Sequence, residues 1–583
     1  MLYIEDNSVV YWKYNHIAVT EAPKTNSGLS TLVSTAPHKP SITFLNLIKL
    51  LTWIQHDDRI KGLYVDFSRT GTTSGLGFAQ LQELRTSIDM LKKAKEKRMG
   101  KGVFKTVAFT DTFESQMDYY LATVFDEIRM EPTGNIPLNG FASSRTFFKN
   151  LIEKVGLKIR AFAIGDYKSV ISSYTETTLP EKQKENMNNL LSNLNDQFKE
   201  TIGNSRRIKF GKGDEKATLE SLMDISPLVA SECVKYNLVD KIAYKRELTP
   251  LFKDSLIDGH PAISLVRYYN AKNTEAIKDS KRYERKLKIG VVNMIGTINR
   301  GDGAFGSTTV SKALIKAAED EEVGGIVLRI DSGGGDVIAS DTIWETVDYV
   351  SKKYNKPVIS SYGNMCASGG VYSSVSSKTI FSSPGTITGS IGVALMRPVI
   401  PPEIFEKLGI TFDQYYFSEG AKNASLMNDL GDNYWERSKK QVQEFYKTFK
   451  EKVSQGRKLS MDHVETVAQG QVWSGKQAND HKLVDKMGGL GAAILAATNE
   501  ALQNQKIDIN HPLWIETEVF PKAPTLLERL SNSSSANDFV KLVQYETAQF
   551  FTGVLQTMTF EAMNEFNPKI SHEYSFSNDI KLE

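Results

Sequence analysis

A serine set among small residues is the position in this sequence best suited to nucleophilic chemistry. Ser368 stands in the turn 367–370 (ASGG), between an apolar strand expected at 357–359 and a continuation with helical character. A hydroxyl at such a strand-to-helix turn lies near a helix N-terminus, where free N–H groups and the positive end of the helix dipole favour developing negative charge. The residue types therefore predict an acyl-transfer site with Ser368 as the nucleophile.

A second glycine-rich turn lies upstream of the first. Residues 330–335 (IDSGGG) follow directly on an apolar stretch, 325–329, that we expect to be a strand. Backbone N–H groups from two such turns can stabilise the charge that develops on one oxygen. We therefore expect the oxyanion donors to be the Gly369 amide and an amide from the turn at Gly334 and Gly335. Because glycine turns after strands are common in α/β proteins, the pattern alone does not establish a nucleophile.

The same pattern runs twice along the chain. Residues 59–67 (RIKGLYVDF) match 322–330 (EVGGIVLRI), and residues 155–159 (VGLKI) match 408–412 (LGITF) at a spacing of 253 residues. Each half alternates apolar strands with helical stretches, as repeated β-α units do. The sequence therefore predicts an α/β fold of two tandem homologous domains.

The predicted division of the chain follows from this repeat and from its charge runs. A charged stretch before residue 287 is typical of a solvated connector, and the repeat ends near residue 500. Beyond a serine-rich break, apolar residues recur at helical spacing and predict a helical C-terminal extension. The predicted parts are a first domain at 1–243, a linker at 244–287, a second domain at 288–500 and the extension at 501–583.

The two halves differ where chemistry would occur. At a spacing of 252 residues Ser368 corresponds to Gln116, and the upstream glycine cluster is reduced to residues 68–71 (SRTG). The first half has therefore lost the nucleophile and most of the oxyanion turn. It keeps an apolar strand that runs into the turn 165–169 (GDYKS) and presents Lys168.

Four segments of the second half resemble one protease family, in order along the chain. Their sequences are LRIDSGGGDVIAS (328–340), KPVISSYGNMCASGGVYSS (356–374), SPGTITGSIG (383–392) and GQVWSGKQANDHKLVDKMGG (470–489). The chain is similar to the signal peptide peptidase A proteases of peptidase family S49, and its duplication is similar to their long form, protease IV. This resemblance implies two domains of the Clp-protease/crotonase superfold and hydrolysis by a Ser-Lys dyad.

The resemblance also implies which residues carry the reaction. GDYKS resembles the segment that carries the general-base lysine in the long form, so Lys168 of the first half would serve Ser368 of the second. Burial can lower the pKa of a lysine from about 10.4 by several units, and such a dyad needs no histidine. In the family the serine of TGSIG hydrogen-bonds the lysine, which implies that role for Ser390. The family usually has proline where Gly333 stands, so this turn departs from the pattern.

Two other residues are alternatives for these roles. Lys422 lies one residue past the position that matches Lys168, and single-domain relatives keep both members of the dyad in one domain. Lys422 is therefore an alternative base. Cys366 lies two residues before Ser368 and is an alternative nucleophile. Since no histidine lies near Cys366 in the sequence to lower its pKa, we favour its interpretation as a small buried side chain.

Composition argues against several other classes of protein. The 71 Lys and Arg residues balance 69 Asp and Glu residues, without the clustered basic excess of a nucleic-acid binder. Two cysteines argue against a disulfide framework, and we expect no metal and no other cofactor. No apolar run has the length of a signal peptide or a membrane span. We expect a soluble cytoplasmic or organellar protein, with peripheral membrane contact left open.

The function that we predict is that of a serine endopeptidase. The resemblance implies hydrophobic, extended peptides such as remnant signal peptides as substrates, and a homo-oligomer, a tetramer, as the assembly. Two alternatives stay open at this point. A crotonase-type acyl-CoA enzyme would use the same glycine turns with an acidic catalytic residue, and a non-catalytic scaffold would keep the fold alone.

Overall fold

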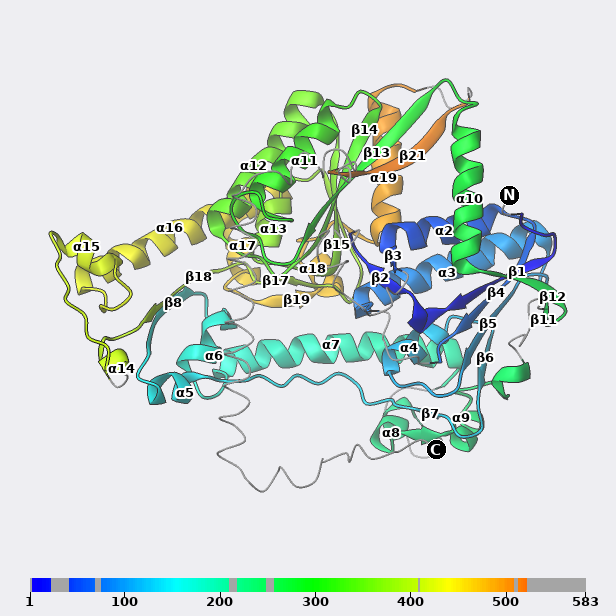
Figure 1. The fold of residues 1–583 in the computed structure, drawn as a ribbon, viewed down its shortest axis with the longest axis horizontal. Coiled ribbons are helices and arrows are strands. Elements are labelled where there is room, and N and C mark those ends of the chain that lie inside the picture. Colours follow the sequence, from blue (N-terminus) through cyan, green and yellow to red (C-terminus); the bar gives the residue numbers. More distant parts are fainter. Residues whose placement is uncertain are drawn as a thin grey trace. The chain divides into compact units, whose positions relative to one another are not determined.

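The two repeats of the sequence fold into two separate β-sheets with helices packed against them (Figure 1). The computed structural model describes residues 3–22, 41–68, 75–208, 218–247, 256–406, 409–507 and 512–521. All of these ranges lie in one unit, Met1–Pro521. The helical extension predicted toward the C-terminus lies outside the described residues from position 522 onward.

The strands of the first sheet are largely buried and mostly parallel. Strand β4 (Ile60–Asp66) is buried along nearly its whole length, as expected for a strand covered on both faces. It pairs in parallel with β1 (Ser8–Lys13) on one side and β5 (Lys105–Thr110) on the other. The order of the described strands is β10-β6-β5-β4-β1-β12-β11, where the other members are β6 (Glu127–Met130), β10 (Lys241–Ile242), β11 (Leu256–Ile257) and β12 (His260–Ser264).

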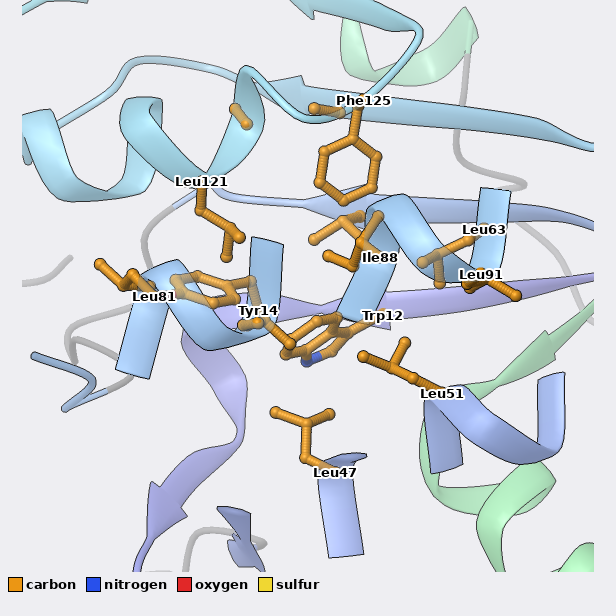
Figure 2. Close-up of a cluster of buried hydrophobic side chains, with 14 of the residues drawn as sticks. Trp12, Tyr14, Leu47, Leu51, Leu63, Leu81, Ile88, Leu91, Leu121 and Phe125 are labelled. Atoms are coloured by element: carbon orange, nitrogen blue, oxygen red, sulfur yellow. The ribbon is translucent and has the colours of Figure 1, made fainter. Parts of the chain in front are cut away.

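Large aromatic and aliphatic side chains fill the first core (Figure 2). Trp12 and Tyr14 are fully buried, with their ring centroids 5.3 Å apart. Leucine and isoleucine side chains of α2 (Phe44–His56) and α3 (Phe78–Met99) belong to the same cluster. Burial of each such side chain contributes about 1.5–3 kcal/mol, so this core anchors the half of the chain that lacks the serine turn.

The second sheet has the same character. Strand β14 (Val323–Ser332) is buried along almost its whole length and pairs in parallel with β13 (Lys286–Ile295) and β15 (Val358–Ala367). Helices α11 (Ser307–Glu319) and α12 (Val337–Tyr354) pack against each other over this sheet. The described order is β19-β17-β15-β14-β13-β21, with β16 beside β15 and β20 beside β16. The other members are β16 (Thr379–Ser382), β17 (Ile387–Gly389), β19 (Val472–Ser474), β20 (Lys486–Met487) and β21 (Trp514–Phe520).

Helix α19 (Leu490–Asn504) joins the two cores. It packs on β14 and β15 of the second sheet and also contacts α2 of the first half. A buried ion pair crosses the same boundary, because Arg329 on β14 lies 2.7 Å from Glu21 of the first half. The two tandem α/β domains predicted from the repeat are therefore confirmed, and they share buried contacts.

Two segments differ from the predicted division of the chain. Within the predicted linker 244–287, β12 pairs in parallel with β1 and is followed by α10 (Leu265–Ser280). The charged run at the end of α10 concealed this short strand, which extends the first sheet. Within the predicted extension 501–583, β21 pairs in parallel with β13, since its aromatic and β-branched residues favour a strand.

Shorter elements surround the two sheets. The short described strands are β2 (Ala18–Thr20) with β3 (Ser41–Thr43), and β7 (Asn135–Ile136) with β9 (Leu228–Val229). The other described helices are α4 (Gln116–Ala122), α5 (Lys149–Lys154), α6 (Ser172–Thr175), α7 (Glu181–Arg206), α8 (Leu219–Asp224), α9 (Ala230–Lys235), α13 (Gly369–Ser374), α14 (Glu403–Glu406), α15 (Glu419–Ala424), α16 (Asp432–Arg457), α17 (Met461–Val467), α18 (Gly475–Asp480) and the 3-10 turns Tyr14–His16, Ser169–Ile171 and Lys245–Glu247. Among the described helices, none combines the length and the apolar composition that a membrane crossing requires.

An antiparallel pair of strands links the two halves. Strand β8 (Lys158–Ile164) of the first half pairs with β18 (Val393–Val399) of the second, with Ile164 opposite Val393. Strand β8 leads into the GDYKS turn, and β18 follows the TGSIG segment. The pairing therefore brings these two predicted site segments to the same end of one ribbon.

Candidate active site

Ser368 occupies the sharp turn between β15 and α13. Its backbone has φ 53° and ψ −117°, a region that residues other than glycine rarely adopt. Its N–H donates to the Gly389 carbonyl at 2.8 Å, and its own carbonyl accepts from the Tyr372 N–H at 3.0 Å. These bonds hold the strained turn at the N-terminus of α13, with Ser368 half-buried. A strand-to-helix turn of this kind displays the nucleophile in other hydrolases.

Three oxygen atoms surround the Lys168 amine. The Nζ atom lies 3.1 Å from Ser368 Oγ, 2.9 Å from Ser390 Oγ and 2.9 Å from the Ser390 carbonyl oxygen. Lys168 comes from the turn after β8 and Ser390 from the turn between β17 and β18. The fold thus brings together the three side chains that the sequence predicted as nucleophile, base and orienting hydroxyl.

Burial changes the protonation of this lysine. Lys168 is only 7% exposed, and burial lowers its pKa to about 8. Within the described ranges no carboxylate forms an ion pair with it, so nothing of opposite charge restores the ammonium form. A substantial share of the amine is therefore uncharged in mildly alkaline solution.

Residues 469–471 form a loop that holds Lys168 and Ser390 together, and we call it the clamp loop. The Gln469 carbonyl accepts from the Tyr167 N–H at 3.1 Å, next to Lys168. The Gln471 carbonyl accepts from the Ser390 N–H at 2.5 Å. One short loop of the second half therefore fixes the backbone on both sides of the amine.

Two glycines allow the clamp loop to approach so closely. A Cβ atom on Gly165, where φ is +101°, would lie 2.2 Å from the Gln469 carbonyl oxygen. A Cβ atom on Gly470, where φ is +81°, would lie 2.6 Å from Lys168 Cα. Side chains at either position would displace the lysine. Sequence reasoning missed this role, although Gly470 opens the GQVWSG segment that carried part of the family resemblance.

Two backbone amides lie beside the Ser368 turn. Gly369 is the first residue of α13, where the N–H has no intrahelical partner. The Gly335 nitrogen is adjacent, because a Cβ atom on Gly369 would lie 3.2 Å from it. Ile298 makes two backbone hydrogen bonds to this turn: its N–H donates to the Gly334 carbonyl, and its carbonyl accepts from the Asp336 N–H. Neither bond uses the Gly335 N–H.

Gly334 was predicted with Gly335 as a possible oxyanion donor, but in the structure it allows the two turns to approach each other. Its N–H donates to Ser332 Oγ at 3.1 Å, so it is already engaged within the turn. Its φ is +102°, and a Cβ atom there would lie 2.9 Å from Ser368 Cβ and 2.7 Å from the Gly369 nitrogen. Glycine at this position is what lets the two turns approach, while the donors left are Gly335 and Gly369.

The alternative site residues lie in other surroundings. Burial raises the pKa of the Cys366 thiol well above its usual value, which disfavours a thiolate nucleophile. Lys422 is exposed on α15, whereas the amine beside Ser368 belongs to Lys168. Gln116 begins α4, and its side-chain oxygen accepts from the Gly140 N–H at 2.8 Å. In the part of the chain that is described, no cluster of His, Cys, Asp and Glu could hold a metal ion.

Known proteins resemble this chain over most of its length. The family model described as peptidase family S49 matches residues 98–255 and 351–504. Protease 4 of Haemophilus influenzae is 29% identical over 477 residues, which cover 81% of this chain and 75% of that protein. The chloroplastic serine protease SPPA of Arabidopsis thaliana is 27% identical over 461 residues, which cover 76% of this chain and 64% of that protein.

A solved structure also matches part of the chain. A ClpP1 mutant from Listeria monocytogenes covers 35% of this chain and 94% of its own length, with 17% sequence identity and a TM-score of 0.25. The S49 model covers more than half of the chain, with one matched segment in each half. The chain therefore belongs to peptidase family S49 and is a serine-type endopeptidase.

Proposed function

We propose that this peptidase acts through a Ser-Lys dyad, with Ser368 as nucleophile, Lys168 as general base and Ser390 as the group that orients the base. The observation that carries the proposal is the 3.1 Å separation of Lys168 Nζ from Ser368 Oγ. Burial supports it, because a lysine with a pKa of about 8 supplies far more neutral amine than an exposed lysine does.

The hydrogen-bonding capacity of the amine supports the role of Ser390. A neutral amine has two N–H donors and one lone pair. The carbonyl and hydroxyl oxygens of Ser390, both 2.9 Å from Nζ, can accept the two N–H groups. The lone pair is then left for the third neighbour, and it accepts the proton of the Ser368 hydroxyl.

The proposed reaction has two stages. As Ser368 Oγ attacks the peptide carbonyl carbon, its proton moves to Lys168 Nζ and the carbonyl oxygen becomes an oxyanion. Collapse of this intermediate breaks the C–N bond, and the ammonium gives its proton to the leaving amine. A water molecule then attacks the acyl-enzyme, passing its proton to Lys168, which returns it to Ser368 Oγ as the carboxylic acid product leaves.

Backbone amides would stabilise the oxyanion in both stages. The proposed donors are the N–H groups of Gly369 and Gly335, which lie beside the Ser368 turn. In another serine hydrolase, loss of one such donor costs about 2.7–4 kcal/mol of transition-state stabilisation. The left-handed backbone of Gly334 keeps the two donors close together.

Hydrophobic, extended peptides such as remnant signal peptides are the substrates that we propose, with a homo-oligomer as the assembled form. Exposed apolar side chains lie near both reacting groups along the chain, with Met365 three residues before Ser368 and Val170 two residues after Lys168. Apolar side chains of a peptide would bury these surfaces, while its backbone pairs with a strand edge.

Variants of the full chain test the dyad on an apolar fluorogenic peptide. Ser368→Ala and Lys168→Ala are each expected to lower kcat by at least about 1,000-fold. Ser390→Ala is expected to lower kcat by about 10-fold, because the lone pair loses one of its two orienting bonds. The matched control is Lys422→Ala, which removes the alternative lysine and should leave kcat unchanged.

The same variants separate the competing functions. Full peptidase activity of Lys168→Ala would refute the dyad. Turnover of a crotonyl thioester that survives in Lys168→Ala would instead favour an acyl-CoA enzyme. The thioester reaction needs an acidic group, and among the described residues no carboxylate hydrogen-bonds Ser368 or Lys168.

A further inference from the structure

A cavity of about 690 Å³ lies in the first half of the chain, and none of the candidate active-site residues lines it. It is bounded by α3, by the residues that follow α4 and by the end of α7. We call it the α3–α7 cavity. Most of its lining residues are polar, and four of them are cations: Arg85, Lys92, Arg206 and Arg207. Several cations around one hollow favour the binding of an anion.

The acidic residues of the α3–α7 cavity do not neutralise all four cations. Each of the three carboxylates already has a basic partner: Asp89 pairs with Lys93, Asp126 with Lys92 and Asp240 with Arg206, at N–O distances of 2.5, 2.6 and 2.9 Å. Among the described residues, no carboxylate forms an ion pair with Arg85 or Arg207. Two positive charges of the cavity are therefore left without a carboxylate partner.

Arg85 carries the buried one of these two charges, since it is only 9% exposed. Its Nη1 donates to the Tyr120 carbonyl and to Thr123 Oγ1, and its Nη2 donates to Ser205 Oγ at 2.9 Å. All three acceptors are neutral, and burial lowers the pKa of Arg85. A guanidinium has five N–H groups, so Nε–H and one N–H of Nη2 have no acceptor among the described residues.

The end of α7 brings the second charge close to the first. Ser205, which accepts from Arg85, lies two residues before Arg207 at the C-cap of the helix. Carbonyl groups at a helix C-terminus disfavour an anion, but here they have donors of their own. The Gly203 carbonyl accepts from the Arg207 N–H, and the Arg206 carbonyl accepts from the Asn237 amide. The exposed polar groups that remain beside Arg85 are therefore mainly donors.

The second half has the same frame around the equivalent place. Arg206 at the end of α7 pairs with Asp240, and Arg457 at the end of α16 pairs with Asp485. The next residue, Arg207 or Lys458, is in both halves a C-cap with left-handed backbone. The two places can therefore be compared residue by residue.

The second half fills this place with its own side chains. Arg85 and Trp344 each stand eight residues after the N-cap of their helix, α3 or α12. Lys452 of α16 lies with its Nζ 3.1 Å from the centroid of the Trp344 ring, so the cation of the second half is held by an aromatic face. In the first half the cation itself comes from α3 and keeps free N–H groups beside the α3–α7 cavity.

We propose that the α3–α7 cavity binds the phosphate group of a small molecule, with Arg85 and Arg207 as its cationic partners. The planar fork of a guanidinium matches two phosphate oxygens, and a dianion balances both unpaired charges. Cavities of this size accommodate small organic molecules, so there is room for the organic part of a phosphate monoester. The inference does not depend on the catalytic roles of Ser368 and Lys168.

Calorimetric titration of the full chain with inorganic phosphate, at constant ionic strength, provides the first test. Wild type should bind one phosphate per chain. Arg85→Met should weaken binding at least about 100-fold, because it removes charge-assisted hydrogen bonds inside the cavity. Arg207→Ala should weaken it about 3-fold, as expected for an exposed charge. Arg267→Ala, at an exposed arginine of α10, is the matched control and should change nothing.

A cavity-filling variant shows where the phosphate lies. Thr86 lines the α3–α7 cavity from an exposed position on α3, so Thr86→Trp should fill it while Arg85 stays in place. Phosphate binding should weaken at least about 10-fold, and Ile277→Trp on α10 should bind like wild type. Because Thr86 is exposed, this test holds even where Arg85→Met does not fold. Wild type without phosphate binding, or unchanged binding in Thr86→Trp, would overturn the proposal.

Other anions identify the source of the phosphate group. Glycerol 3-phosphate or adenosine 5′-monophosphate should bind at least about 10-fold more tightly than inorganic phosphate if the ligand is a monoester, and the opposite order indicates free phosphate. Acetate, which carries one charge, should bind at least about 10-fold more weakly than phosphate. Acetate that binds as tightly as phosphate would refute a phosphate site. Ser368→Ala should bind phosphate like wild type, which separates failure of this inference from failure of the dyad.

Discussion

The turns at Ser368 and Gln116 occupy equivalent places in the two halves, yet their side chains are used in opposite ways. The Ser368 hydroxyl lies 3.1 Å from a lysine amine that comes from the other half. The Gln116 side chain makes its hydrogen bonds within its own half, where its oxygen accepts from the N–H groups of Asn139 and Gly140. One turn places a hydroxyl beside an amine, and the other fixes the backbone at Asn139 and Gly140 by hydrogen bonds.

In the proposed dyad, a duplicated chain divides one reaction between its two halves. The first half delivers Lys168 at the end of β8, and the second half supplies Ser368 and the glycine turns. Because β8 pairs with β18, the turn after β8 places Lys168 beside the serine turn. Under this proposal, the first half needs the strand that carries Lys168 but no nucleophile of its own.

The pH dependence of the reaction provides the strongest test of Lys168 as the base. As the proposed base, Lys168 has to be neutral to accept a proton, and burial lowers its pKa to about 8. The value of kcat/KM should therefore rise about 10-fold per pH unit well below pH 8 and level off above it, which is about 50-fold between pH 6 and pH 8. A profile of kcat/KM that is flat between pH 6 and pH 8 would exclude Lys168 as the base.

Gly470→Ala should displace Lys168 of the first half from Ser368 of the second half. A methyl group there would lie 2.6 Å from Lys168 Cα, so the amine moves away from Ser368. We expect kcat to fall about 100-fold, as for other displacements of about 1 Å, with a much smaller change in KM. Gly409→Ala is the matched control, because Gly409 has a similar φ of +75° but nothing near its Cβ position. Equal losses in both variants would indicate backbone strain and not displacement of the base.

Lys168→Met should show how much the buried amine lowers the free energy of unfolding. Its folded pKa of about 8 is below the unfolded value of about 10.4, so the unfolded chain binds more protons between these pH values. Wild-type stability should therefore rise from pH 8 to pH 10.4, and the penalty is complete below pH 8. Relative to wild type, Lys168→Met should gain about 2.5 kcal/mol more at pH 7 than at pH 10 in urea unfolding. A gain that does not depend on pH would show that burial does not lower the pKa of the Lys168 amine.

Local signals made part of this site predictable from the sequence. Ser368, Lys168 and Ser390 each sit in a short motif next to an apolar strand, so their positions at strand ends could be read from neighbouring residues. The clamp loop could not be read in this way, because its contact with Lys168 joins residues some 300 positions apart. Its only local signal was the glycine at position 470, and glycine is common in loops.

The fold was predictable to a similar degree. The repeat of apolar strands indicated two α/β domains, since strand and helix patterns depend on nearby residues. Strands β12 and β21 were assigned to a linker and an extension, because each is short and gains its stability by pairing with a distant strand. Pairing of β8 with β18 is likewise a tertiary contact, which no periodicity within either segment specifies.

Gln116→Ser should sharpen the comparison with the smallest effect on activity. Made in a Ser368→Ala background, it restores a hydroxyl to the first half, yet peptidase activity should stay at the Ser368→Ala level. The segment 113–118 (FESQMD) lacks the small-residue turn that holds Ser368, and Lys168 lies beside Ser368 of the second half.

Gln116→Ser should lower the stability of the protein. Loss of the Gln116 oxygen leaves the Asn139 and Gly140 N–H groups without their acceptor, at a cost of about 1–3 kcal/mol in the free energy of unfolding. Gln116→Glu keeps an acceptor oxygen and should lose less, which makes it the matched control. Recovery of peptidase activity by Gln116→Ser would mean that the first half had kept a working oxyanion site, and that its glutamine alone had silenced it.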